Sequence, residues 1–93
     1  MEAQTFDNVF EALTDTPAEA ANMKARAELL SALRARVQSW GLTQETAAER
    51  LGITRPRLND LMRGKLAKFS LDALVNLTAA AGLGLEIKVA DAA

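Results

Sequence analysis

The chain has 93 residues, of which 49% are hydrophobic and 25% are charged, a composition that suits one globular domain and is too apolar for a disordered chain. It contains no cysteine, histidine or tyrosine, which excludes disulfides, thiolate nucleophiles, zinc sites built on cysteine, and Ser-His-Asp triads. No glycine-rich nucleotide motif occurs, and no apolar run approaches the roughly 20 residues that span a bilayer. We therefore expect a protein that is not an enzyme, uses no metal or cofactor and does not enter a membrane.

The net charge of −1 hides a strong asymmetry along the chain. Residues 1–23 carry five acids and no base, residues 24–68 carry ten bases and four acids, and residues 69–93 carry one base and three acids. The three segments thus have net charges of −5, +6 and −2. A basic middle between acidic flanks predicts two partners of opposite sign, unless these are ordinary solvated faces.

The chain begins with an acidic arm, residues 1–16. The arm lacks the basic segment and apolar run of a secretory signal, which favours a cytosolic protein. Four apolar residues are spaced as one face of a short helix: Phe6, Val9, Phe10 and Leu13. This face either covers the domain's own core or docks onto another protein.

Four helices are predicted next, over residues 17–40, 44–51, 55–63 and 71–81. Each begins after a residue that favours the N-cap and ends near a glycine, the residue that best adopts the left-handed conformation after a helix. Apolar residues recur every three or four positions and predict the core. They are Met23, Ala27, Leu30, Leu33, Val37, Trp40, Ala47, Ala48, Leu51, Leu58, Leu61, Met62, Leu71, Leu74, Val75 and Thr78.

The periodicity changes after the fourth helix. Leu83, Leu85, Ile87 and Val89 alternate with glycine, charged and small residues, which is typical of a half-buried strand. A lone strand leaves its backbone unpaired, so this strand should pair with the N-terminal arm or with the same strand of a second chain. The four apolar residues are the expected dimer interface if two chains pair here, and packing through the fourth helix is the alternative.

The second and third predicted helices are about two turns long and are joined only by Gly52-Ile53-Thr54. Two short helices with a three-residue turn indicate a helix-turn-helix, in which Ile53 should plug the core. The run LTQETAAERLGITRPRLNDLMRGK, residues 42–65, resembles the lambda-repressor-like, XRE-type helix-turn-helix family. The resemblance rests on Thr43-Gln44 at the start, Leu51-Gly52-Ile53 at the turn and Arg63-Gly64-Lys65 at the end.

Residues 24–89 as a whole are similar to small antitoxins of the HigA type. The resemblance implies an all-α domain over residues 17–93, with four main helices and one short C-terminal β-strand in place of a fifth helix. It also implies a cytoplasmic bacterial repressor that binds its operator as a homodimer, together with a ribonuclease toxin of the RelE/HigB type. The alternatives are a free-standing XRE-type regulator without a toxin, or a protein-interaction module that does not bind DNA.

The candidate contacts with duplex DNA follow from this motif. The first turn of a recognition helix faces base edges in the major groove, so the expected base contacts are Arg55, Pro56, Asn59 and Asp60. Asp60 has an alternative as an ion-pair partner of Arg57 or Arg63. The expected phosphate contacts are Thr43, Gln44, Thr54, Arg57, Arg63 and Lys65. If a toxin exists, its basic surface would attract the acidic arm, and Phe6, Val9, Phe10 and Leu13 would anchor there.

Overall fold

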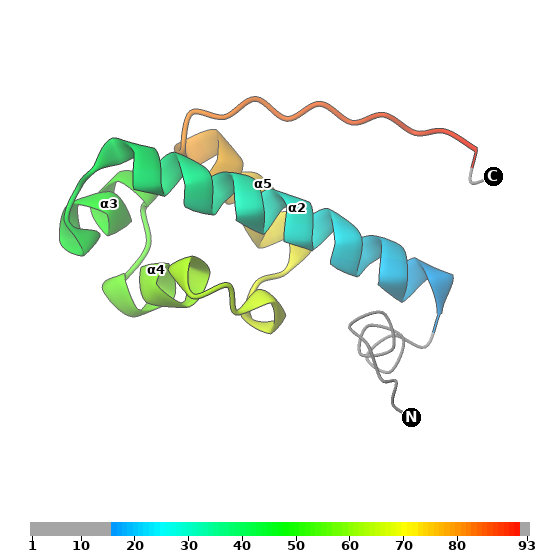
Figure 1. The fold of residues 1–93 in the computed structure, drawn as a ribbon, viewed down its shortest axis with the longest axis horizontal. Helices are drawn as coiled ribbons and strands as arrows, with labels where there is room; N and C mark the ends of the chain where they lie inside the picture. Colours follow the sequence, from blue (N-terminus) through cyan, green and yellow to red (C-terminus); the bar gives the residue numbers. More distant parts are fainter. Residues whose placement is uncertain (1–15, 92–93) are drawn as a thin grey trace.

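The computed structural model describes residues 16–91. This part of the chain forms α2 (Pro17–Trp40), α3 (Gln44–Leu51), α4 (Arg55–Met62), a short 3₁₀ helix η1 (Leu66–Lys68) and α5 (Leu71–Ala80) (Figure 1). The four predicted helices are confirmed, with ends that differ by at most one residue. The helix η1 was not predicted from the sequence, and the apolar residues of the arm lie outside the described residues.

The caps that predicted the helices also form in the structure. The side-chain oxygens of Thr16, Thr43, Thr54 and Ser70 each accept a hydrogen bond from the backbone N–H three residues later. These bonds satisfy donors that a helix leaves free in its first turn. Each of the four α-helices therefore begins at the cap that the local sequence predicts.

The core lies where α2 crosses the other helices. The long helix α2 packs chiefly against α5, while α3 packs against α4 (Figure 1). Among the described residues, the buried hydrophobic core consists of Leu30, Leu33, Val37, Ala47, Ala48, Leu51, Leu58, Leu61, Phe69, Leu74, Leu77 and Ala81. Trp40, which was predicted as a core residue, and Ile53, which was predicted to plug the core, are half-buried and pack against its edge. Phe69, Leu77 and Ala81 were not predicted.

The predicted C-terminal strand is not seen, and this expectation is corrected. Residues 83–91 leave α5 as an extended tail that runs back past α2 (Figure 1). Leu83 donates its N–H to the carbonyl of Thr78, but from Gly84 to Asp91 no described segment forms a ladder with the tail. A strand needs a hydrogen-bonded partner, and residues 16–91 of one chain do not supply one. Within residues 16–91, no helix is long and apolar enough to cross a membrane.

Candidate nucleic-acid interface

The turn between α3 and α4 fixes the geometry of the candidate interface. Gly52 adopts a positive φ of 74°, and the next N–H, that of Ile53, donates to the carbonyl of Ala48 at 3.0 Å. This arrangement ends α3 sharply and leaves one residue before the N-cap of α4. Ala47 and Ala48, both about 2% exposed, have side chains small enough for α3 to lie close to its neighbours. The result is a rigid pair of short helices, as a helix-turn-helix requires.

The first turns of α3 and α4 meet at the surface. Gln44 from α3 and Arg55, Pro56 and Asn59 from α4 line one open, shallow depression. The side chains of Gln44, Arg55 and Pro56 are exposed, and that of Asn59 is half-buried. Four of the predicted DNA-contacting residues therefore lie together, although 15 positions separate Gln44 from Asn59. A guanidinium and an amide here can reach base edges, and the free N–H groups at both helix starts suit phosphate oxygens.

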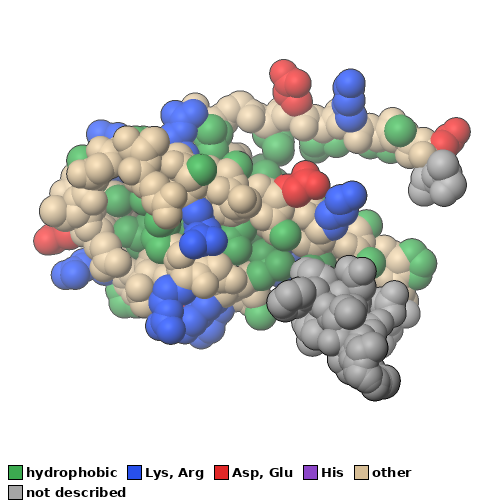
Figure 2. Space-filling view, viewed as in Figure 1, with side chains coloured by type: hydrophobic (Ala, Val, Ile, Leu, Met, Phe, Trp, Pro, Cys, Tyr) green, Lys and Arg blue, Asp and Glu red, His purple; other side chains and the backbone are tan. Residues whose placement is uncertain are grey.

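Basic side chains surround α4. Residues 55–68 contain five bases and a single acid, Asp60. Figure 2 shows Lys and Arg side chains gathered over α4 and η1. Arg63, which caps the end of α4, is exposed, and so are Lys65 and Lys68. Lys68 was not among the predicted contacts, because η1 has no sequence periodicity to reveal it.

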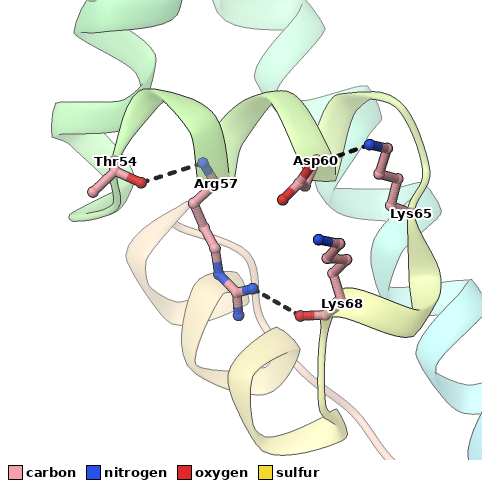
Figure 3. Close-up of polar contacts among 5 residues, drawn as sticks. All are labelled: Thr54, Arg57, Asp60, Lys65 and Lys68. Atoms are coloured by element: carbon pink, nitrogen blue, oxygen red, sulfur yellow. Dashed lines mark hydrogen bonds and ion pairs between the residues drawn. The ribbon is translucent and has the colours of Figure 1, made fainter.

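Arg57, which was expected to contact a DNA phosphate, makes contacts within the chain in the structure. Its guanidinium donates to the carbonyl of Lys68 at 2.7 Å and stacks over the ring of Phe69, 4.1 Å from the ring centroid (Figure 3). Phe69 is about 1% exposed and is among the largest fully buried side chains of the described residues. Arg57 thus links α4 to the end of η1 and to Phe69 directly after it, so its guanidinium is already engaged within the chain.

Asp60 forms an ion pair with Lys65, with 3.7 Å between Oδ1 and Nζ (Figure 3). The structure therefore supports the predicted alternative of an ion pair, but with Lys65 in place of Arg57 or Arg63. The Asp60 side chain is 22% exposed and that of Lys65 is 41% exposed. The pair reduces the repulsion that a lone carboxylate would exert on a nearby phosphate, so α4 retains a surface that suits DNA.

Two arginines of α2 contact the segment that follows α4. Arg26 donates to the carbonyls of Leu66 and Phe69 at 3.1 and 3.3 Å, which ties η1 to α2. Arg34 is half-buried next to Gly64, and its Nε is buried without an acceptor among the described residues. Neither contact was predicted, because charged residues in a long helix ordinarily face solvent.

The remaining aromatic residue of the helices does not present a stacking surface. The guanidinium of Arg50 lies over the ring of Trp40, 4.7 Å from its centroid, while Trp40 packs against the core. Trp40 therefore packs against the core at the end of α2 with one ring face covered by Arg50. Residues 16–91 also contain no group of three or more acidic residues placed to hold a metal ion.

Comparison with known families identifies the motif. The model of a helix-turn-helix domain family matches residues 12–90 of the chain. The chain belongs to this helix-turn-helix family. A search of curated proteins finds no match. Membership in the family indicates a DNA-binding regulator, in agreement with the exposed first turn of α4 and the basic side chains around it.

Proposed function

We propose that the protein is a sequence-specific repressor that inserts α4 into the major groove of duplex DNA and binds a palindromic operator as a homodimer. The observation that carries this proposal is the depression shared by Gln44, Arg55, Pro56 and Asn59 at the first turns of α3 and α4. A helix-turn-helix reads bases with the first turn of its second helix, while the first helix meets the backbone. In this arrangement Arg55 reads a guanine, Asn59 an adenine, and Gln44 holds a phosphate.

A dimer is part of the proposal because one such domain presents a single eight-residue recognition helix. Two helices related by a twofold axis read half-sites about 34 Å apart, which is one turn of DNA. The cations Arg63, Lys65 and Lys68 would then lie beside the groove on each half-site and neutralise phosphates. Their contribution is independent of sequence and weakens as salt rises.

The test separates base readout from phosphate contact. An operator is first selected from random duplexes, and gel shifts then compare cognate with scrambled DNA. Arg55→Ala should weaken cognate binding by about 1 to 3 kcal/mol, or roughly 5- to 150-fold, and relax one base position. The matched control is Arg63→Ala, which should weaken all sequences alike and reduce the salt slope by about 1. Equal loss on both DNAs for Arg55→Ala would remove Arg55 from base readout. If the unaltered chain binds no duplex, the repressor proposal fails and an interaction module is favoured.

We further propose that the repressor is the antitoxin of a toxin–antitoxin pair. This rests on the resemblance of residues 24–89 to HigA-type antitoxins and on the charge of −5 over residues 1–23. A ribonuclease must attract RNA, so its active surface should be basic and complementary to this acidic segment. Phe6, Val9, Phe10 and Leu13 would then anchor the arm on the toxin.

The neighbouring gene provides the first test, since a small basic protein should be encoded beside this one. Deletion of residues 1–15 then tests the arm. Neutralisation of the toxin should be lost, while DNA binding and the melting temperature are retained. A large fall in melting temperature would instead make the arm part of the fold. Absence of any such neighbour would favour a free-standing regulator.

A further inference from the structure

The C-terminal tail has one apolar side that the other described residues, 16–82, leave partly uncovered. A groove of about 590 Å³ separates the tail from α2 and α5, with Leu29, Leu71 and Val75 on the helices and Leu85 and Ile87 on the tail. Figure 2 shows hydrophobic side chains on the side of the tail toward the helices and charged side chains on its outer side. The alternating pattern of a strand is therefore present without a partner strand.

Exposure of the apolar residues rises along the tail. Leu85 is 43% exposed, Ile87 77% and Val89 91%. Leu85 lines the groove together with Leu71 and Val75 of α5, whereas Val89 has almost no cover from the described residues. The backbone from Gly84 onward also presents its N–H and C=O groups without a described ladder partner. Such an edge pairs readily with another strand.

We propose that this edge pairs with the same tail of a second copy of the chain, antiparallel, with Ile87 on the twofold axis. The proposal rests on the homodimer proposed above and names its interface and register. Ile87 then faces the partner subunit's Ile87, Leu85 faces the partner subunit's Val89, and Glu86 faces the partner subunit's Lys88. The last pair occurs twice by symmetry, so the outer side of the ribbon carries two opposite-charge pairs.

Charge complementarity selects this register over its neighbours. If one tail shifts by two residues relative to the other, the twofold axis falls on Glu86 or, for the opposite shift, on Lys88. Glu86 then faces the partner subunit's Glu86, or Lys88 faces the partner subunit's Lys88, so that like charges oppose each other. A slide of one residue opposes apolar positions to charged ones. A register centred on Leu85 leaves Glu86 and Lys88 facing glycines, and one centred on Val89 leaves them facing alanines. The axis at Ile87 therefore gives the largest number of favourable pairs.

The same register also covers the exposed end of the tail. Antiparallel pairing places Val89 beside the partner subunit's Leu85, which lines the groove of that subunit. Each copy thus buries the part of the tail that the other leaves open. A two-stranded ribbon is only marginally stable in water, but the grooves of both subunits offer it an apolar surface to pack against.

Charge reversal tests the register. Glu86→Lys alone, or Lys88→Glu alone, places like charges opposite each other twice and should raise the dimer Kd roughly 2- to 30-fold. A mixture of the two variants restores both opposite-charge pairs, so the heterodimer should form in preference to either homodimer. Sedimentation and native mass spectrometry measure both effects. Equal affinities for all three dimers would overturn the register.

Disulfide trapping gives a second, independent measurement, since the natural chain has no cysteine. Facing residues in an antiparallel pair have Cα atoms about 4.5 or 5.5 Å apart, within the range that a disulfide bridges. Ile87→Cys should therefore cross-link to itself under mild oxidation, whereas the matched control Leu85→Cys should not. Equal cross-linking of both variants, or of neither, would overturn the proposal.

Gel shifts on the selected operator keep this proposal distinct from the proposed function. Operator binding by a dimer that does not cross-link through Ile87→Cys would overturn only the interface. Cross-linking through Ile87→Cys without any duplex binding would support the interface and overturn the repressor.

Discussion

Substitution of Arg57 distinguishes a role of this side chain in folding from a role in DNA binding. Its guanidinium hydrogen-bonds to the carbonyl of Lys68 at 2.7 Å and stacks 4.1 Å from the ring centroid of Phe69. A cation stacked at a partly exposed site contributes about 0.5 to 1 kcal/mol. A hydrogen bond from a charged donor contributes about 1.5 kcal/mol or less when solvent reaches it. Arg57→Ala should therefore lower the free energy of unfolding by about 1 to 2 kcal/mol.

For a domain of this size, a loss of 1 kcal/mol lowers the melting temperature by about 4 to 8 °C. Thermal and urea unfolding, followed by circular dichroism, should accordingly show a fall of about 4 to 16 °C for Arg57→Ala. Arg57→Lys is the matched variant, because it keeps the positive charge and loses the planar group that stacks and reaches Lys68. It should destabilise the fold nearly as much as alanine does.

Measurements of DNA affinity provide the result that would contradict a folding role for Arg57. If Arg57 holds a phosphate in the complex, Arg57→Ala should leave the melting temperature within about 2 °C of the unaltered chain and still weaken all duplexes alike. Arg57→Lys would then retain most of the affinity, because lysine also neutralises a phosphate. That pair of results would refute the role assigned from the structure and restore the one expected from the sequence.

Three further changes test the fold that positions α4. Gly52→Ala should lower the free energy of unfolding by about 1 to 2 kcal/mol, measured by chemical denaturation, because φ is positive there. Gly84→Ala is the control and should be neutral, because φ is not positive at Gly84 and no atom obstructs a Cβ. Thr54→Ala removes the cap on the first turn of α4 and should cost about 0.5 to 2 kcal/mol, measured as a shift in the urea midpoint at an unchanged slope. Leu61→Ala empties a site that is 0% exposed and should cost about 2 to 5 kcal/mol; a loss under 1 kcal/mol in calorimetry would contradict its place in the core.

The helices were predictable because their signals are local. Thr16, Thr43, Thr54 and Ser70 each act on an N–H only three residues away, so no knowledge of distant contacts was needed to place the helix starts. The turn between α3 and α4 was equally local, since its three residues and the glycine within it already limit the possible backbone paths.

The partners of individual side chains were harder to predict, because they depend on segments without periodicity. Arg57 lies at the start of a helix where a DNA contact is expected, yet its carbonyl partner comes from η1, 11 residues later. Phe69 sits between η1 and α5, outside every predicted helix, so no apolar stripe marked it as core. In the tail, the alternation of apolar and polar residues is local and predicts an extended backbone, which the structure has. A strand also requires a hydrogen-bonded partner strand, which the described part of one chain lacks.

The ends of the described chain lie away from the recognition helix. The molecule measures 43 Å along its longest axis, and in Figure 1 the start of α2 and the end of the tail lie at one end of that axis, with α3 at the other. A fluorophore or fusion partner attached near Asp91 would therefore sit far from an operator held by α4. By the same geometry, a molecule that docks near the start of α2 would leave the DNA-facing side open, so a ternary complex is sterically feasible.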